Sequence, residues 1–318
     1  MKSLIFTLLT LLGYSLTFAS YPDKPITVVV GFPPGSAPDV AVRSITQKLS
    51  ARIGQAVVVE NRSGAAGTIG AASVARAAAD GYTLLFGSAS SLTVGPALYK
   101  NLSYDTVKSF APIVQMLRGA FILTVRADLP INNVKELVAL AKKNPGRMTY
   151  GSSGNGSLHH LCMEMFKSAA NVYITHIPFR GSPQSWFALN SGEVDMICDS
   201  MPNPIPLIQS GKGRAIAVTG ERKVESLPKA LTFKEQGYPV LNIDFWYGFL
   251  APAGTPSDII HFLNTEITAV LKDPEIVNRY MAQSIEIVPG KPEDFARLLA
   301  DEVKFWPAVV DKAGAKID

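Results

Sequence analysis

The stretch YGSSGNGSLHH, from Tyr150 to His160, combines the end of a strand, a small polar loop and the beginning of a helix. An apolar helical run follows from Leu158 to Ala170. Glycine lets the backbone approach a ligand closely, and the first N–H groups of a helix have no partner within it. The helix dipole adds about half a positive charge at that end. The stretch therefore predicts an anion site.

A second loop of the same kind, FPPGSAPD, spans Phe32 to Asp39. It follows a strand at 26–31 and precedes a helix from Val40 to about Arg52. Ser36 and Asp39 have the spacing of a capping box. We interpret the chain as two lobes, each presenting one strand–loop–helix end to a shared cleft.

Further strands alternate with helices, which predicts a parallel α/β sheet. Strands are expected at 56–60 and 82–86, and the second opens onto the polar loop 87–91. Ligands of such sheets lie beyond the carboxyl ends of the strands, so Ser88 is a candidate contact.

Two separate strand-like runs, 110–114 and 121–125, come next. We place the first crossing between the lobes at the second run and the return crossing at 245–250. Between them, Val134 to Lys143 has apolar residues on one helical face and predicts an amphipathic helix.

Composition excludes several classes of protein. The chain has 318 residues, of which 47% are hydrophobic and 18% charged, which is enough for one or two packed cores. The formal net charge of +4 is small and no dense Lys/Arg cluster occurs, so we expect no nucleic-acid partner.

Residues 1–19 have the pattern of a signal peptide: Lys2, an apolar run at 4–16 and a small residue, Ala19. The apolar run is shorter than the roughly 20 residues that span a bilayer. We therefore predict export to the periplasm with cleavage near Ala19, rather than a membrane anchor.

The chain has two cysteines, Cys162 and Cys198. An oxidising compartment allows them to pair, but the sequence cannot place their Cα atoms within about 7 Å. We favour two buried thiols that pack as small hydrophobes. Without paired histidines they make a poor metal site, and we expect no metal and no cofactor.

The ordered motifs resemble the Bug or TctC-like receptors, which are extracytoplasmic solute-binding proteins, many of them associated with tripartite tricarboxylate transporters. The resemblance covers essentially the whole mature chain. Besides the two loops, it is carried by YPDKPI at 21–26, NRSGAAGTIGA at 61–71, DGYTLLFGS at 80–88, LSYDTVKSFAPI at 102–113, GEVDMICD at 192–199 and APAGTP at 251–256.

The resemblance implies a type II periplasmic-binding-protein fold that closes like a Venus flytrap. Residues 20–122 with 246–318 would form one lobe and 123–245 the other. It implies a monomeric receptor that captures a small organic acid, a di- or tricarboxylate or an aromatic carboxylate, and delivers it to integral-membrane transporter subunits.

In that family the two loops bind one carboxylate through backbone groups and ordered water. Ser36 stands where the family usually has a second glycine, and Gln184, Ser185 and Trp186 replace smaller residues, which leaves ligand size open. The contacts that the resemblance and the loop composition nominate are Pro34, Gly35, Ser36, Asp39, Ser152, Ser153, Gly154, Gly156, Ser157 and His160.

Three candidates, Arg180, Asp199 and His160, keep two readings each. The turn Phe179–Arg180–Gly181 offers a guanidinium that could pair with a ligand carboxylate or be a surface charge. Asp199 would repel a carboxylate, so we favour a structural role for it. His160 is either a ligand contact or a packing histidine. The other histidines, His159, His176 and His261, are predicted to be structural.

Enzyme motifs are missing from the sequence. Gly151-x-Ser153 lacks the second glycine of a nucleophile elbow, because Asn155 stands in its place. We therefore predict a binding protein rather than an enzyme. The alternative is an exported serine hydrolase that uses Ser153 or Ser157 with His160.

Overall fold

The structure, a computed structural model, describes residues 21–201, 203–221, 224 and 226–315. The predicted signal peptide lies outside the described residues. The strands are β1 (Ile26–Val30), β2 (Val57–Asn61), β3 (Thr83–Ser88), β4 (Phe110–Arg126), β5 (Thr149–Ser152), β6 (Thr175–Pro178), β7 (Met196–Ser200), β8 (Gly213–Val218), β9 (Asp244–Pro252) and β10 (Glu286–Ile287).

The helices are α1 (Ala37–Ile53), α2 (Thr68–Ala75), α3 (Gly95–Leu98), α4 (Val134–Lys143), α5 (Leu158–Ala170), α6 (Ser182–Ser191), α7 (Pro204–Gln209), α8 (Ser257–Leu271), α9 (Pro274–Met281) and α10 (Pro292–Ala313). Short helical turns are η1 (Ala65–Gly67), η2 (Ser90–Val94) and η3 (Pro239–Leu241).

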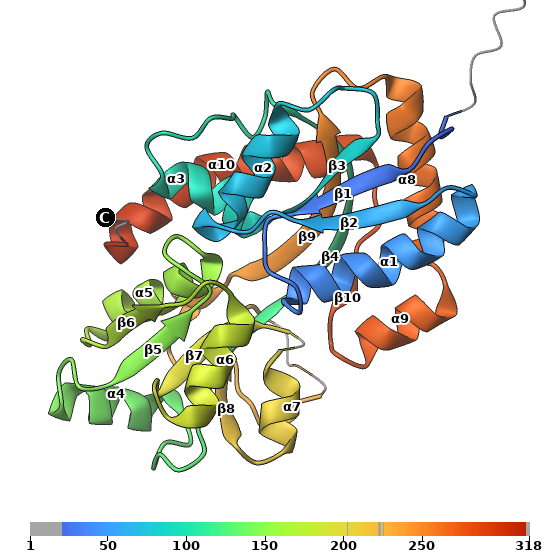
Figure 1. Cartoon of the computed structure of the whole chain (residues 1–318). Coiled ribbons are helices and arrows are strands. Elements are labelled where there is room, and N and C mark those ends of the chain that lie inside the picture. Colours follow the sequence, from blue (N-terminus) through green and yellow to red (C-terminus); the bar gives the residue numbers. More distant parts are fainter. Residues whose placement is uncertain (1–20, 202, 222–223, 225, 316–318) are drawn as a thin grey trace, which may run out of the picture.

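The elements form two lobes, which confirms the expected two-lobe α/β architecture (Figure 1). In one lobe, β1 pairs in parallel with β2 and β3, and helices α1, α2 and α8 lie around this sheet. In the other, β5 pairs in parallel with β6 and β7. The boundaries expected at 122/123 and 245/246 stay a prediction.

Strands β4 and β9 connect the lobes. The sequence predicted two short runs at 110–114 and 121–125, but the structure has one 17-residue strand, β4. Its first part pairs antiparallel with β9, and its last residues pair antiparallel with β7 and β8. The sheet is therefore mixed rather than parallel, because both crossings are long antiparallel strands.

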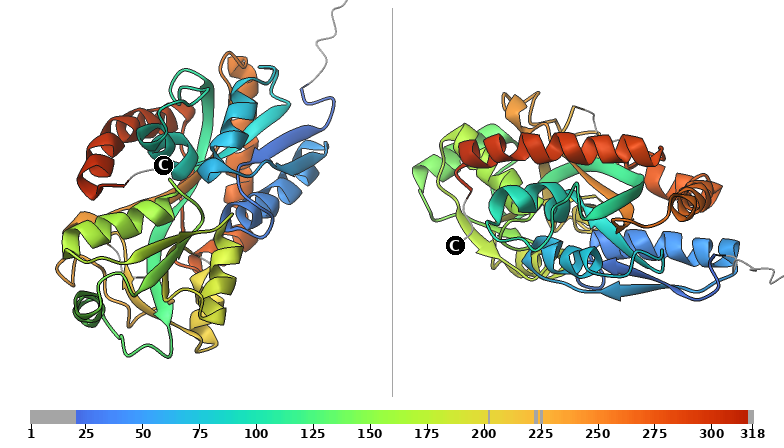
Figure 2. Two further views of the ribbon diagram at one scale, coloured as in Figure 1. Left: turned by 60° about the vertical axis from the view of Figure 1, so that its left-hand side comes forward. Right: turned by 90° about the horizontal axis from the view of Figure 1, so that it is seen from above.

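Local sequence explains the elements that hold the site. The β-branched residues of β1 are almost all buried, as in a central strand covered on both faces. Helix α5 is capped at its N-terminus by Ser157, whose hydroxyl accepts the His160 N–H, and at its C-terminus by Asn171 in the left-handed conformation. Helix α10 packs against β4 and reaches α5 of the other lobe (Figure 2).

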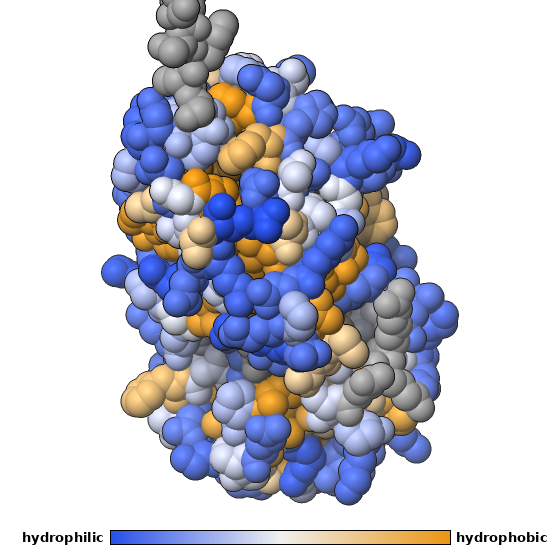
Figure 3. All heavy atoms as spheres, turned by 90° about the vertical axis from the view of Figure 1, so that its right-hand side faces the viewer, coloured by the Kyte–Doolittle hydropathy of each residue, from blue (hydrophilic) through white to orange (hydrophobic). Residues whose placement is uncertain are grey.

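The described part of the chain contains no helix that could span a membrane. None of its helices combines the length and the apolar character needed to cross a bilayer. On the face shown in Figure 3, apolar residues form small patches separated by hydrophilic ones.

Candidate functional site

A cavity of about 520 Å³ lies where the two predicted loops meet, and we call it the outer chamber. Both lobes contribute to it, as the two-loop interpretation requires. Its lining residues are Gly31, Phe32, Pro33, Ser63, Gly64, Ala65, Ala66, Gly67, Tyr99, Ser153, Gly154, Asn155, Pro178, Phe179 and Arg180.

A second space of about 20 Å³, the inner chamber, adjoins the outer one at Phe32. A volume of this size holds about one water molecule. Its lining is rich in hydroxyls and aromatic rings: Phe32, Ser36, Pro38, Ser88, Ala89, Ser90, Phe121, Leu158, His159, Ser182, Ser200, Phe245, Trp246 and Tyr247.

The first loop is held by Asp39, although not as the predicted capping box. The Gly35 N–H, rather than that of Ser36, donates to Asp39 Oδ2 at 2.9 Å, and Asn61 donates to Oδ1 at 2.8 Å. The Ser36 hydroxyl donates to the Pro33 carbonyl at 2.7 Å instead of capping the helix. Asp39 is 3% exposed, so it shapes the loop and does not face the cavity.

The second loop folds back on itself around Gly154. The Ser157 hydroxyl donates to the Gly154 carbonyl at 2.7 Å and accepts the His160 N–H at 3.2 Å. Ser157 is fully buried, so it caps α5 and is placed away from a ligand. Ser152 is also buried, 2.7 Å from His176 Nε2.

Hydrogen bonds between the lobes close this end of the cleft. The first N–H of α5, at Leu158, donates to Ser90 Oγ of the other lobe at 3.0 Å. The Tyr99 hydroxyl donates to the Asn155 carbonyl at 2.9 Å. At the helix end that the sequence predicted as an anion site, the Leu158 N–H is therefore already hydrogen-bonded to the opposite lobe.

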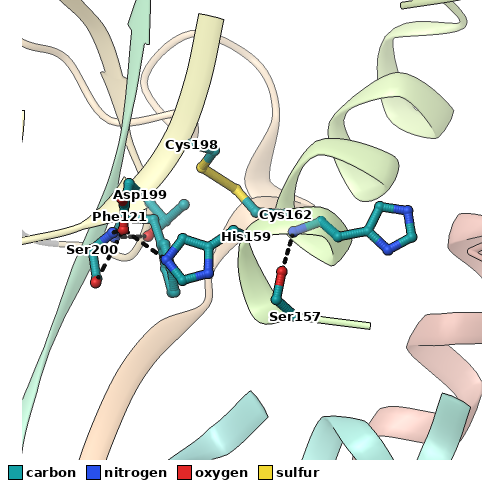
Figure 4. The surroundings of a disulfide bond; sticks show 9 residues. Phe121, Ser157, His159, Cys162, Cys198, Asp199 and Ser200 are labelled. Atoms are coloured by element: carbon teal, nitrogen blue, oxygen red, sulfur yellow. Dashed lines mark hydrogen bonds and ion pairs between the residues drawn. A yellow bond between two sulfur atoms is a disulfide. The ribbon is translucent and has the colours of Figure 1, made fainter. Parts of the chain in front are cut away.

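His159, which we predicted to be structural, bridges the second loop and β7. Its Nδ1 lies 2.7 Å from Ser153 Oγ and its Nε2 lies 2.6 Å from Asp199 Oδ1. Asp199 is fully buried and also accepts from the Trp186 indole N–H at 2.5 Å and the Ser200 N–H at 2.7 Å. Figure 4 shows His159 pointing from α5 toward Asp199.

Electrostatics agrees with an ionised Asp199. Burial alone raises the pKa of a carboxyl group, but the charge of His159 and the hydrogen bonds from His159, Trp186 and Asn203 together hold the pKa of Asp199 below its ordinary value. The oxygens of Asp199 are occupied by protein donors, an arrangement that fits the structural role that we favoured for it.

A disulfide joins Cys162 and Cys198, so the prediction of two buried thiols is wrong (Figure 4). Their Cα atoms lie 6.7 Å apart, although 36 positions separate them in sequence. Cys162 lies three residues after His159, and Cys198 comes immediately before Asp199. The bond therefore fastens the N-terminal half of α5 to the middle of β7, beside that pair.

His160 packs against His176 and not into the chambers. The two rings stack with centroids 4.2 Å apart, and the Gly156 N–H donates to His160 Nδ1 at 3.3 Å. Burial lowers the pKa of both histidines, and for His176 burial with the nearby His160 and Lys167 lowers the pKa to about 3.

We expect this stack to make the fold sensitive to acid. Because the folded pKa of His176 lies below its unfolded value of about 6.5, the unfolded chain binds more protons between pH 6.5 and 3, and stability falls as pH falls through this window. Since the ring is partly exposed, about 1 kcal/mol should be lost at pH 5. Thermal unfolding should show this as a Tm lower by about 1–2 °C than at pH 7.5.

His176→Gln should reduce this acid sensitivity, whereas His261→Gln, at an exposed histidine of α8, should retain it. Equal pH dependence in the two variants and the wild type would show that the stack does not contribute.

Some of the predicted site residues line one of the two chambers, and the others line neither. Ser36 and Ser88 line the inner chamber, whereas Ser153, Gly154, Phe179 and Arg180 line the outer one. Gly181 abuts the other lobe, since a Cβ there would lie 2.5 Å from Pro33 Cγ. Lining neither described chamber are Pro34, Gly35, Asp39, Ser152, Gly156, Ser157, His160, Gly181 and Asp199.

Sequence reasoning missed His159, Ser90 and Tyr99. Ser90 lies on the polar loop that follows β3, so its position after a strand was a usable signal, whereas Tyr99 lies beyond α3 and carried no such signal. His159 carried none, because its partners Ser153 and Asp199 come together only through the packing of α5 on β7.

The hydrolase alternative is not realised with the residues that we named. Neither Ser153 nor Ser157 contacts the His160 ring: Ser153 bonds to His159, and Ser157 bonds to the Gly154 carbonyl and the His160 backbone. Within the residues that the structure describes, no group of three or more His, Cys, Asp or Glu side chains could hold a metal ion.

Comparison with known proteins gives consistent results. The family model described as "Tripartite tricarboxylate transporter family receptor", TctC, matches residues 41–315. Protein BugT of Bordetella pertussis is 34% identical over 299 residues, which cover 94% of this chain and 92% of BugT.

Solved structures superpose closely. The periplasmic binding protein BugD is 36% identical with a TM-score of 0.89, over 93% of this chain and 99% of BugD. R. palustris Rpa4515 with adipate is 33% identical with a TM-score of 0.89, over 93% and 100%. MatC of Rhodopseudomonas palustris with bound malate is 29% identical with a TM-score of 0.87, over 91% and 100%. The chain belongs to the TctC family of tripartite tricarboxylate transporter receptors, which includes the Bug proteins.

Proposed function

We propose that this protein is a periplasmic receptor that binds a small organic acid between its lobes and delivers it to membrane transporter subunits. The observation that carries the proposal is the outer chamber, which both predicted loops line. Its volume of about 520 Å³ lies within the range of small-molecule sites.

The chemistry of the cleft favours a carboxylate. The loops at 32–39 and 150–160 contain no Lys or Arg, so an anion there would be held by backbone N–H groups, hydroxyls and helix dipoles. Hydrogen bonds to a charged group contribute about 1.5–3 kcal/mol each. Several such bonds reach micromolar affinity, which needs about 8 kcal/mol.

Two similar structures contain dicarboxylic acids, adipate and malate. Among the residues that line the outer chamber, Arg180 is exposed and Phe179 carries an aromatic ring. We propose that one carboxylate lies near Ser153 and Gly154 and that the rest of the acid extends toward these two residues. The protein acts as a monomer, without a cofactor and without catalysis.

Calorimetric titration with adipate, malate, citrate and benzoate tests the proposal, with glucose and putrescine as controls. The protein is first unfolded and refolded to remove any acid carried from the cell. Micromolar binding of at least one acid supports the proposal. Binding of glucose or putrescine alone contradicts it.

A further inference from the structure

We infer that His159 supplies the positive charge for carboxylate recognition and passes it to the outer chamber through the Ser153 hydroxyl. The inference rests on the proposed function and adds to it a specificity-determining residue whose protonation controls affinity.

The first step is the charge on Asp199. The Asp199 side chain is fully buried. Its ion-pair partner in the described part of the chain is His159, whose Nε2 lies 2.6 Å from Asp199 Oδ1. A buried carboxylate without a cation is costly, so the pair is most stable as carboxylate and imidazolium. Hydrogen bonds from Trp186 and Ser200 supplement the imidazolium and do not replace its charge.

The second step is the direction of the next hydrogen bond. An imidazolium donates from both nitrogens, so Nδ1–H donates to Ser153 Oγ, 2.7 Å away. With its oxygen accepting this bond, the Ser153 hydroxyl has its own hydrogen available for another acceptor. Ser153 lines the outer chamber beside Gly154, so that hydrogen is directed to the space where we place the carboxylate.

The third step is the choice of ligand. A serine donor backed by an imidazolium stabilises an anion more than a neutral group, since hydrogen bonds with a charged partner are roughly twice as strong as neutral ones. The relay therefore favours a carboxylate over an amide or alcohol of the same shape. Loss of the His159 proton reverses the bond, and Ser153 then donates to Nδ1 and offers the ligand lone pairs instead.

Few other titratable groups lie near the His159 imidazole in the described part of the chain. Phe121 of β4 packs edge-on against the imidazole at 5.3 Å. On β7 the titrating group is Asp199 itself, and on β9 it is Tyr247, whose pKa burial raises. At the start of α1, Asp39 is paired with Arg43. His160, the next residue on α5, stacks on His176. The comparison of variants below therefore separates His159 from these neighbours.

The test is calorimetric affinity for adipate, malate, citrate and benzoate at pH 6 and pH 9, in wild type, His159→Gln and Asp199→Asn. In the wild type we expect affinity to fall at least tenfold from pH 6 to pH 9. Both variants should bind at least tenfold more weakly at pH 6 and show little pH dependence. His261→Gln, at an exposed histidine, is the matched control and should behave like the wild type.

Two outcomes separate the inference from the proposed function. If an acid binds wild type and His159→Gln with the same pH dependence, the relay is wrong and the receptor function stands. If no acid binds, the proposed function fails, and with it the recognition role inferred here. Nitrogen NMR of the His159 ring tests the inference without any ligand, and a singly protonated ring at pH 6 would overturn it. Stoichiometric labelling of Ser153 by a fluorophosphonate would also overturn it, because such labelling indicates that Ser153 is a nucleophile.

Discussion

Replacing Gly154 by valine is expected to lower organic-acid affinity at least 100-fold, because two effects act at the centre of the second loop. Gly154 has φ +120°, a conformation that side-chain-bearing residues rarely adopt, and a Cβ would lie 3.3 Å from the Phe179 carbonyl. Valine would shift the loop that positions Ser153 and its hydrogen bond to His159. Calorimetric titration of a variant shown to be folded by circular dichroism measures the effect.

Gly211→Val is the matched control. Gly211 also has positive φ, +71°, but it lies between α7 and β8 with open space around its Cβ. It should cost stability and leave affinity within about threefold. Gly35→Val should be intermediate, since Gly35 has φ +78° and no atom within 4 Å of a Cβ. Wild-type affinity in folded Gly154→Val would place the site elsewhere.

Removal of the Cys162–Cys198 disulfide should lower the free energy of unfolding by about 3–4 kcal/mol. The bond closes a loop with a sequence separation of 36, and cross-linking a loop of that length restricts the unfolded chain by roughly this amount. The double variant Cys162→Ala/Cys198→Ala is compared with the wild type by denaturant unfolding.

Reduction provides the control for this prediction. Dithiothreitol should destabilise the wild type to about the level of the double variant, and should leave the variant unchanged. A thiol assay on the unfolded, unreduced wild type should detect no free cysteine. Two reactive thiols in that assay, with equal stability of the two proteins, would mean that the bond does not form.

Local signals in the sequence predicted much of the fold. The bounds of α4 and α5 agree with the expected 134–143 and 158–170, because polar N-caps and periodic apolar residues mark them. Strand β4 was divided in error. Gly119 resembles a break between the runs expected at 110–114 and 121–125, yet pairing with β9 continues through it, after two register shifts between Pro112 and Leu117 for which no local signal exists.

The site was predicted at the level of loops and not of contacts. A glycine-rich loop after a strand is a local feature, so Ser153 and Gly154 were found. Whether a polar side chain faces the cavity or holds the backbone depends on distant partners. Asp39 turns inward to Asn61, and His159 meets Asp199 across 40 positions, which only the folded chain reveals.

The pairing of β3 with β9 also sets the order in which the two sheets can close. Strand β3 pairs along one edge with β9, which lies more than 150 residues later in the chain. The strands β5 to β8 lie within one continuous segment that precedes β9. The lobe that holds β5 to β8 can thus complete its sheet first, while β3 keeps an open edge until β9 pairs with it, the kind of edge that binds chaperones or aggregates.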